Sequence, residues 1–299
     1  MKHLIAVDWG TSSLRGALLD GSGAVLGEVS VPAGILGVPG GGFPAIFEQH
    51  FGQWQASTGA LALIAGMAGS RQGWQEAPYC ACPAGFSDIA SRLHWIEAGR
   101  IALVPGLSCE DGGVPDVMRG EETQAFGALD LLGLADARLV LPGTHSKWVR
   151  AQGGRITQFR TFMTGELYAL LRQHSILART LPATDGELDA DTFRRGLLHA
   201  FESASLLHSA FSARTLALFE RLPPAAMPSY LSGLVIGEEL RAQGHDEGGA
   251  DPVLVIGAPA LTARYRLALE SLGIAARTVG AEASWRGLWA IARQLEQTR

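Results

Sequence analysis

Short apolar runs separated by turn residues predict that strands open this chain. HLIAVDWG, LRGALLD and GAVLGEVSV are joined by turns that include the GSG at 21–23, and they predict a meander of three strands. Residues 43–57 carry a helical pattern. ALALIAGMAG then predicts a buried strand that leads into a glycine-rich loop.

The second half of the chain repeats the start of this order. RLVLPGT, HSKWVRAQ and RITQFRTF predict strands, with a glycine turn at 153–154. Helical patterns follow in GELYALLRQHSILARTL and in the amphipathic run 189–222. PVLVIGAP predicts a late buried strand, LTARYRLALESLG a helix, and the tail from Ser284 a further helix. Strands mixed with helices in this order predict an α/β fold with a partly parallel sheet.

The repeated order predicts two lobes, 1–118 and 119–299, with the C-terminal helix free to pack back on the first lobe. RGEETQAFGALDLLG predicts a helical connection between them. A chain of 299 residues with 47% hydrophobic content can fill two cores.

Charge and apolar run length exclude several classes of partner. A net charge of -5, from 29 acids and 24 bases with no block of like charge, argues against nucleic acid and membrane surfaces and favours small polar metabolites. The apolar runs are shorter than the roughly 18 to 20 residues of a membrane helix. Asp8 interrupts the first run, which argues against a signal peptide. Three cysteines without the spacing of a disulfide framework or zinc site predict reduced thiols in a cytoplasmic protein.

Two Gly-Thr turns carry candidate chemistry. In the first, Asp8 ends a predicted strand, where an acid can bind Mg²⁺ directly or through water. The amides and hydroxyls expected to bind the β- and γ-phosphates are those of Gly10, Thr11, Ser12 and Ser13. An ordinary hairpin turn is the alternative for one isolated copy.

The second turn strengthens the phosphate interpretation. Its candidates are Gly143, Thr144, His145, Ser146 and Lys147. Lys147 could offset phosphate charge during transfer, whereas His145 is more typical of a hydrogen-bonding turn residue than of a base. In VIGAPALTARY, Gly257, Ala258 and Leu261 are candidate contacts of adenine and ribose, although this strand-turn-helix pattern is structural in most α/β proteins.

Transfer of a phosphoryl group to an alcohol also needs a carboxylate that takes the hydroxyl proton. Glu121 and Glu122 are the first candidates, since acids behind a glycine at a helix start are stabilised by the helix dipole. Solvated first-turn glutamates are the alternative. Glu166 and then Asp88 are weaker candidates.

The loop AGMAGSRQGWQEAPY suits a small polyol or sugar acid. A surface loop with Trp74 against the core is the alternative. The substrate-binding candidates are Arg15, Met67, Gly69, Ser70, Arg71, Trp74 and Arg119. Guanidinium groups match a carboxylate in a bidentate way, so Arg71, Arg119 and Arg160 each remain open for an acidic substrate.

These motifs together resemble one family. DWGTSSLRG, the loop above, VMRGEETQAFGA, LPGTHSKWV, FRTFMTGELYALLRQHS, YLSGLVIGEE and LTARY are similar, nearly end to end, to 2-dehydro-3-deoxygalactonokinases of the sugar kinase, Hsp70 and actin (ASKHA) superfamily. The resemblance implies two RNase H-like lobes of the actin-like ATPase fold with a nucleotide and substrate cleft between them. It also implies transfer of phosphate from ATP, with Mg²⁺, to the 6-hydroxyl of 2-dehydro-3-deoxy-D-galactonate in galactonate breakdown.

One departure and two alternatives accompany this resemblance. More distant sugar kinases carry a catalytic Asp where this chain has Glu121 and Glu122, so the identity of the base stays open. A kinase of another sugar or sugar acid would keep the phosphate features. A non-catalytic actin-like nucleotide switch would use the same turns for conformational change. A homodimer is possible.

Overall fold

The computed structural model describes residues 1–203, 205–244 and 251–297. The chain forms two compact units: unit 1 is Met1–Leu139, Val149–Arg160 and Val279–Arg299, and unit 2 is Val140–Trp148 and Thr161–Thr278. Neither unit is a single stretch of chain. The predicted lobes, 1–118 and 119–299, are continuous stretches of chain and so do not coincide with these units. The division into lobes after residue 118 stays a prediction.

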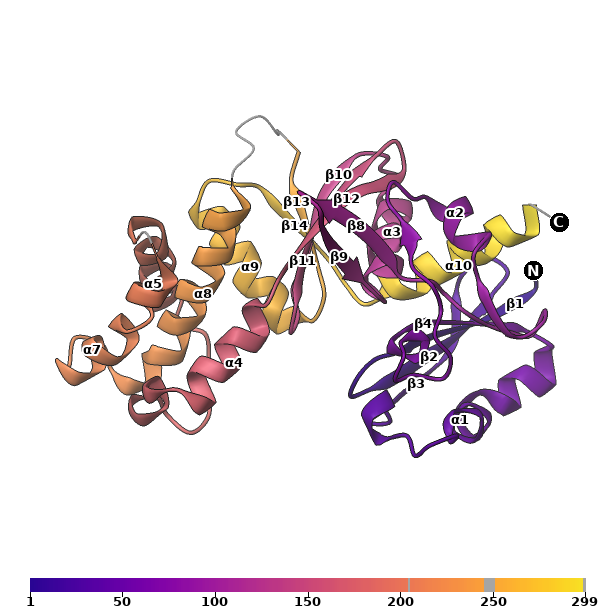
Figure 1. Ribbon diagram of the computed structural model, residues 1–299, viewed down its shortest axis with the longest axis horizontal. Helices are drawn as coiled ribbons and strands as arrows, with labels where there is room; N and C mark the ends of the chain where they lie inside the picture. Colours follow the sequence, from indigo (N-terminus) through magenta and orange to yellow (C-terminus); the bar gives the residue numbers. More distant parts are fainter. Residues whose placement is uncertain (204, 245–250, 298–299) are drawn as a thin grey trace. The chain divides into compact units, whose positions relative to one another are not determined.

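A six-stranded sheet of order β3-β2-β1-β4-β7-β6 forms much of unit 1 (Figure 1). Its strands are β1 (His3–Trp9), β2 (Leu14–Asp20), β3 (Val25–Val31), β4 (Leu61–Gly66), β6 (His94–Glu97) and β7 (Ile101–Leu103). The predicted meander is confirmed, because β2 pairs antiparallel with both β1 and β3. β1 and β4 run parallel, with Trp9 opposite Gly66. The carboxyl ends of β1 and β4 therefore lie side by side, which brings the first Gly-Thr turn close to the glycine-rich loop.

The core on one face of this sheet explains the predicted helix at 43–57. Helix α1 (Phe43–Thr58) has a proline in its first turn and ends at Gly59, whose φ of 64° is left-handed. Its Phe47 and Phe51 are buried with Val7 and Ile64 of the sheet. The short 3₁₀ turn η1 (Ile35–Gly37) precedes this helix, and Ile35 belongs to the same core.

Residues 80–118, for which the pattern predicts no element, form short pieces. They include helix α2 (Phe86–Ala90) and a three-stranded sheet of order β5-β8-β9, made of β5 (Cys80–Ala81), β8 (Leu107–Asp111) and β9 (Val114–Met118). Strands this short give too little periodicity to be recognised in a sequence. β9 leads directly into the start of α3 (Glu121–Leu132).

The last helix, α10 (Glu282–Gln297), packs against α3 in unit 1. A Cβ atom added to Gly127 would lie 1.8 Å from the Ala283 carbonyl oxygen, and one added to Gly287 would lie 1.9 Å from that of Thr123. The two helices approach so closely because each has a glycine at the crossing point.

A five-stranded sheet has the order β12-β11-β10-β13-β14. Its strands are β10 (Ala137–Leu141), β11 (Ser146–Gln152), β12 (Arg155–Phe162), β13 (Val253–Ile256) and β14 (Ala276–Val279). The helices of unit 2 are α4 (Thr164–His174), α5 (Ala190–Glu202), α6 (Leu206–Ser209), α7 (Ser212–Leu218), α8 (Met227–Gln243) and α9 (Pro259–Ser271). The amphipathic run 189–222 is thus divided among α5, α6 and α7. Further 3₁₀ turns are η2 (Met67–Gly69), η3 (Ile176–Thr180) and η4 (Pro224–Ala226).

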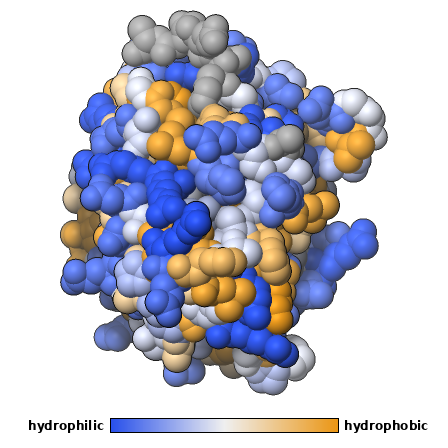
Figure 2. All heavy atoms as spheres, turned by 90° about the vertical axis from the view of Figure 1, so that its left-hand side faces the viewer, coloured by the Kyte–Doolittle hydropathy of each residue, from blue (hydrophilic) through white to orange (hydrophobic). Residues whose placement is uncertain are grey.

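The face of unit 2 that carries α5 and α7 mixes apolar and charged side chains (Figure 2). Leu207 on α6 is 95% exposed, and Phe219 just after α7 is 73% exposed. Within the described ranges, no helix is both long and apolar enough to cross a membrane.

Candidate functional site

The first Gly-Thr turn is a tight connection held by the segment before η1. The Gly10 amide donates to the Ser13 carbonyl at 2.9 Å, and the Ile35 amide donates to the Gly10 carbonyl at 3.0 Å. A Cβ atom on Gly34 would lie 2.3 Å from the Thr11 carbonyl oxygen, so only glycine fits beneath the turn. The side chains of Thr11, Ser12 and Ser13 are exposed. Their hydroxyl groups remain accessible to a phosphate.

Asp8 lies at the end of β1, directly before this turn. Its carboxylate pairs with the Arg15 guanidinium on β2, and the two residues face each other in the strand register. Arg15 also lies over the Trp285 ring, 5.9 Å from the centroid. A single carboxylate beside exposed hydroxyls fits Mg²⁺, because this ion takes one or two carboxylates and completes its shell with phosphate oxygens and water.

Glycines bring the start of α3 to the same edge of the sheet. Gly120 has a φ of 106°, and a Cβ atom there would lie 3.2 Å from the Gly66 Cα atom. A Cβ atom on Gly66 would in turn lie 3.3 Å from Asp8 Oδ1. Gly66 therefore lies between Asp8 and Gly120, the residue that precedes the two candidate glutamates, and all of these residues belong to unit 1.

The structure separates Glu121 from Glu122. Glu122 is fully buried; its Oε2 accepts the Gly120 amide at 2.6 Å, and its Oε1 has no partner among the described residues. Burial raises the pKa of Glu122 to about 8, and the nearby Glu121 charge adds to this rise. Glu121 is only half-buried, and its Oε2 accepts the Arg119 amide at 3.0 Å. Of the pair, Glu121 is the one that a ligand can reach.

Arg119 lies beneath the loop that follows β4. Its Nη2 donates to the Ala77 carbonyl at 2.7 Å, and its guanidinium lies 4.3 Å from the centroid of the Tyr79 ring. A Cβ atom on Gly69 would lie 2.9 Å from Arg119 Nη1. Arg119 Nε and Nη1 are buried, and no described residue hydrogen-bonds them. Arg119 thus anchors the loop to the start of α3.

The other loop candidates differ in their surroundings. Trp74 packs among Trp9, Phe43 and Phe47, with centroid distances of 5.8 to 6.3 Å, and Met67 is packed against the same core. This is the core packing of Trp74 that the sequence leaves as an alternative. Arg71 is 87% exposed and pairs with Glu76 at 2.9 Å. Ser70 Oγ is buried, with no partner among the described residues.

The second Gly-Thr turn is held by the start of α4. The Glu166 amide donates to the Thr144 carbonyl at 2.9 Å, and the Glu166 carboxylate lies 2.7 Å from His145 Nε2. A Cβ atom on Gly165 would lie 2.2 Å from the Gly143 carbonyl oxygen. Thr144 and His145 are exposed. The weaker base candidate Glu166 therefore supports this turn.

Lys147 has a different environment from the turn before it. Its side chain is 6% exposed, and its ammonium group donates to Thr161 Oγ1 at 2.8 Å. Lys147 is thus enclosed in unit 2 in this conformation, whereas the turn beside it faces solvent.

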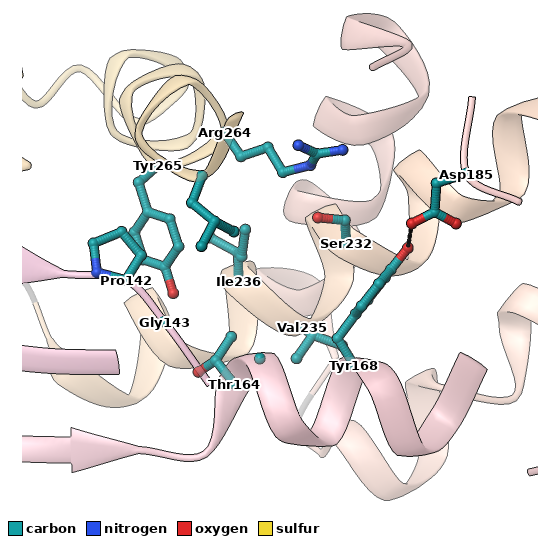
Figure 3. A pocket seen from close by; sticks show the side chains of 12 residues that line it. Pro142, Gly143, Thr164, Tyr168, Asp185, Ser232, Val235, Ile236, Arg264 and Tyr265 are labelled. Carbon is teal, nitrogen blue, oxygen red and sulfur yellow. Dashed lines mark hydrogen bonds between the residues drawn. The ribbon is translucent and has the colours of Figure 1, made fainter. Parts of the chain in front are cut away.

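A cavity of about 220 Å³ opens beside this turn in unit 2 (Figure 3). It is lined by Pro142, Gly143, Thr164, Gly165, Tyr168, Asp185, Ser232, Val235, Ile236, Leu261, Arg264 and Tyr265. Val235, Ile236 and Leu261 give it apolar walls. At one end the Tyr168 hydroxyl donates to Asp185 at 2.9 Å. A cavity with apolar walls and a few polar groups is suited to a flat, partly polar ligand.

Only some of the cavity residues are predictable from the sequence. Of the three residues expected to contact adenine, Leu261 lines the cavity. Gly257 lies beside Pro142, and Ala258 is the exposed N-cap of α9. Tyr168, Ser232 and Arg264 come from three helices, and no local sequence signal joins them.

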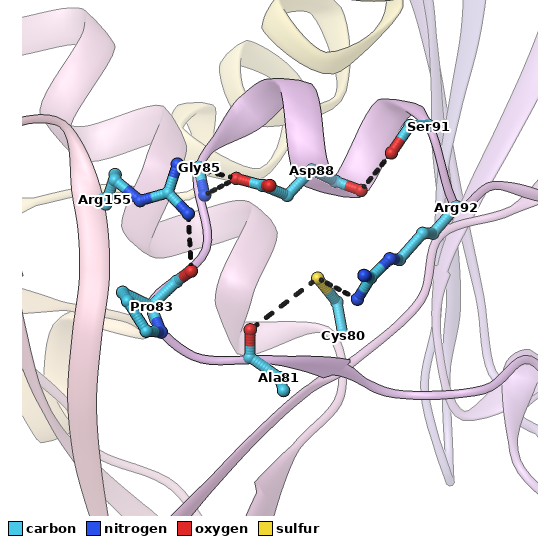
Figure 4. A network of polar contacts seen from close by, with 8 residues as sticks. All are labelled: Cys80, Ala81, Pro83, Gly85, Asp88, Ser91, Arg92 and Arg155. Atoms are coloured by element: carbon cyan, nitrogen blue, oxygen red, sulfur yellow. Dashed lines mark hydrogen bonds and ion pairs between the residues drawn. The ribbon is translucent and has the colours of Figure 1, made fainter.

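Asp88, the weakest base candidate, belongs to a polar network elsewhere in unit 1 (Figure 4). Its carboxylate accepts the Gly85 amide at 2.8 Å and pairs with Arg155 at 3.0 Å. Arg155 also donates to the Pro83 carbonyl at 2.6 Å. These contacts hold the start of α2, which is a structural role. Cys80, Cys82 and Cys109 form no disulfide bond within the described residues.

Comparison with known proteins decides the family. The family model for 2-keto-3-deoxy-galactonokinase matches residues 8–291. The chain belongs to the 2-keto-3-deoxy-galactonokinase family. As a member of a sugar-acid kinase family, it is a phosphotransferase, and the resemblance predicted from its motifs is confirmed.

Two curated relatives of this kinase are similar over nearly their whole length. A protein of Rhizobium meliloti (strain 1021), named as a probable 2-dehydro-3-deoxygalactonokinase, DgoK1, is 39% identical, with 98% of this chain and 97% of the relative covered. The 2-dehydro-3-deoxygalactonokinase of Escherichia coli (strain K12) is 34% identical, with 94% of each covered.

Solved structures confirm the fold class of the kinase. A crystal structure from Sinorhizobium meliloti, which carries the 2-dehydro-3-deoxygalactonokinase assignment, has a TM-score of 0.86 at 39% identity and covers 97% of this chain and 98% of its own. Component A of the (R)-2-hydroxyglutaryl-CoA dehydratase of Acidaminococcus fermentans has a TM-score of 0.53 at 12% identity over 100% of both chains, which concerns the fold alone. The predicted α/β actin-like ATPase fold is therefore confirmed.

Proposed function

We propose that this kinase transfers the γ-phosphoryl group of ATP to the 6-hydroxyl of 2-dehydro-3-deoxy-D-galactonate, in galactonate breakdown. Membership of the 2-keto-3-deoxy-galactonokinase family supports this proposal, as does the name of the Escherichia coli relative. The observation that carries the nucleotide part is the cavity that adjoins the second Gly-Thr turn within one unit.

The cavity is the proposed site of the adenosine moiety. Its apolar side chains, Val235, Ile236 and Leu261, would pack on the faces of the base. Ser232 and Arg264 are polar groups that could bind ribose hydroxyls or ring nitrogens. Gly143 belongs both to the cavity wall and to the turn, so phosphates attached to this nucleoside would continue toward the exposed Thr144 and His145.

Asp8 is the proposed residue for Mg²⁺, and the Gly10–Ser13 turn the proposed partner of phosphate oxygens. Bound Mg²⁺ would neutralise part of the charge on the transferring phosphoryl group. Arg15, paired with Asp8, fixes the orientation of that carboxylate. The roles predicted for Gly257, Ala258 and Lys147 stay predictions.

Glu121 is the proposed general base. It is half-buried in the first turn of α3, where the helix dipole stabilises a negative charge. It would take the proton of the 6-hydroxyl as the new oxygen–phosphorus bond forms and the bond to the ADP oxygen breaks. Glu122 has a raised pKa and no exposed surface, so it would hold its proton at neutral pH and support the helix start instead.

The loop over Arg119 is the proposed region that binds the sugar acid. The substrate roles of Met67, Gly69, Ser70, Arg71 and Trp74 stay predictions, as does that of Arg119. A cytoplasmic location and a homodimer also belong to this proposal. The lack of a disulfide bond within the described residues supports the location, and the exposed apolar side chains of α6 and α7 suit a protein partner.

A coupled assay of ADP release tests the reaction. With MgATP, we expect strong stimulation by 2-dehydro-3-deoxygalactonate, less by its C4 epimer 2-dehydro-3-deoxygluconate, and none by neutral hexoses. Slow ATP hydrolysis that no sugar stimulates would instead indicate a nucleotide switch, and activity on another compound only would move the substrate while keeping the kinase.

Two matched variants test the base in the same assay. Glu121→Gln should lower kcat by at least about a hundredfold, since general base catalysis contributes roughly 10²–10⁴. Glu122→Gln should lower it by less than about tenfold, because a protonated carboxyl and an amide are similar in shape and charge. Equal, mild losses in both variants would contradict the assignment and direct the search for the base to Glu166.

A further inference from the structure

Glu239 is a buried carboxylate on α8 that receives hydrogen bonds from four side chains. Its Oε1 accepts from Ser146 Oγ at 2.9 Å and from Trp148 Nε1 at 2.7 Å. Its Oε2 accepts from the Tyr265 hydroxyl at 2.6 Å and from Thr164 Oγ1. The residue is 2% exposed. Each carboxylate oxygen therefore has two donors, which offset the cost of burying the group.

Two of the four donors line the nucleotide cavity, and a third follows the exposed turn beside it. Ser146 directly follows the exposed turn residue His145 and begins β11. Thr164 begins α4, and Tyr265 belongs to α9; both line the cavity. A single carboxylate on α8 thus connects the turn to two residues of the cavity wall.

Glu239 itself is absent from the cavity wall, so its effect on a ligand would pass through its donors. We propose that Glu239 is a positioning residue for the nucleotide. Its hydrogen bonds hold the Gly143–Ser146 turn in a fixed position relative to the cavity wall formed by Thr164 and Tyr265. This inference rests on the proposed binding of ATP in this cavity. No sequence pattern assigns Glu239 this part, because its donors lie 26 to 93 residues away along the chain.

The chemistry of the donors explains why an amide would be a poor substitute. The Trp148 indole can only donate, so Gln at position 239 must turn its oxygen toward Trp148 and Ser146. Its amide then faces two hydroxyls that donate to the carboxylate in the native protein. Those hydroxyls, on Thr164 and Tyr265, would have to rotate and lose their fixed direction. Glu239→Gln is therefore expected to disturb the cavity wall while preserving side-chain volume.

The test compares Glu239→Gln with Glu238→Gln, a matched control on the same helix. Glu238 is 23% exposed and pairs with Arg241, away from the cavity. Titration calorimetry with MgATP should give a Kd at least about tenfold higher for Glu239→Gln and an unchanged Kd for Glu238→Gln. In the kinase assay, KM for ATP should rise in the same proportion, with KM for the sugar acid within about twofold. A loss that fell equally on both KM values, or on kcat alone, would overturn the proposal.

A third variant separates this inference from the proposed nucleotide site. Leu261→Arg places a long charged side chain in the cavity. If Leu261→Arg leaves the MgATP Kd unchanged, the cavity does not bind the nucleotide and the proposed function of the cavity fails. If Leu261→Arg abolishes binding while Glu239→Gln binds normally, the cavity is retained and the positioning role is overturned.

Trp148→Phe decides the matter if Glu239→Gln does not fold. This change removes one donor to Glu239 from a residue that does not line the cavity. A Kd for MgATP raised at least about threefold, with a cooperative thermal unfolding transition, supports the proposal. An unchanged Kd overturns it.

Discussion

At the scale of single residues, burial separates two adjacent glutamates that look alike in the sequence. Glu121 keeps an accessible carboxylate, whereas Glu122 is enclosed with one oxygen bound to the Gly120 amide and the other without a partner among the described residues. A carboxyl group with so few donors is more stable when it is neutral. The pair thus combines a candidate base with an acid that stabilises the helix start.

Glu122 should make the stability of the protein depend on pH. Its pKa is about 8 in the folded protein against an ordinary value of 4.5, so between these pH values the folded chain holds a proton that the unfolded chain has lost. Its contribution to stability is complete below pH 4.5 and is lost as the pH rises through about 8. Between these values, the free energy of unfolding should fall by at most about 1.4 kcal/mol per pH unit through this group.

Urea unfolding between pH 5 and pH 9, at ~1 pH unit steps, measures this dependence. Glu122→Gln should flatten the decline, while Glu110→Gln, at an exposed position, should leave it as in the native protein. A decline that Glu122→Gln does not change would show that other groups cause it.

At the scale of elements, both Gly-Thr turns depend on a glycine in a different segment. Gly34, before η1, lies under the first turn, and Gly165, in the first turn of α4, lies under the second. In each case a Cβ atom would collide with a turn carbonyl at 2.2 to 2.3 Å. Backbone contact with these glycines thus holds each turn on one side. The turn side chains Thr11, Ser12, Ser13, Thr144 and His145 remain exposed.

Gly34→Ala should therefore displace the first turn. The added methyl group collides with the Thr11 carbonyl oxygen, and overpacking of this kind costs about 1–3 kcal/mol of unfolding free energy. We also expect KM for MgATP to rise at least about fivefold, if a shifted turn loses close to 1 kcal/mol of phosphate binding. Thermal unfolding and steady-state kinetics measure both effects.

Gly37→Ala is the matched control in the same segment, because nothing lies within 4 Å of its added Cβ atom. It should change stability by less than about 0.5 kcal/mol. Similar behaviour of the two variants would mean that the first turn does not rest on Gly34.

At the scale of the whole molecule, the end of the chain completes the unit that its beginning starts. Helix α10 packs against α3, and Trp285 on α10 donates to Glu28 on β3 at 2.8 Å. Arg286 pairs with Asp130 of α3. Residues more than 250 positions apart thus contact each other, so unit 1 is complete only when the C-terminal helix is in place.

Gly287→Ala tests this closure. The methyl group would lie 1.9 Å from the Thr123 carbonyl oxygen, so α10 must move away from α3. We expect the free energy of unfolding to fall by about 3 kcal/mol, at the upper end of overpacking costs. Gln297→Ala, at an exposed position of the same helix, should have little effect in the same denaturation experiment. A Gly287→Ala protein as stable as this control would contradict the close helix crossing.

The sequence by itself determined the α/β class, the opening meander, the helix predicted at 43–57 and the family, because each depends on local periodicity or on contiguous motifs such as MRGEETQ and PGTHSKWV. Only the tertiary structure decided that Glu121 is accessible while Glu122 is enclosed, and that Trp74 packs in the core. Only the tertiary structure brings Tyr168, Ser232 and Arg264 together in the lining of one cavity. It also places Glu239 in hydrogen-bond contact with Ser146, next to the turn at that cavity. Burial and convergence arise from contacts between distant segments, and a pattern of neighbouring residues carries no record of them.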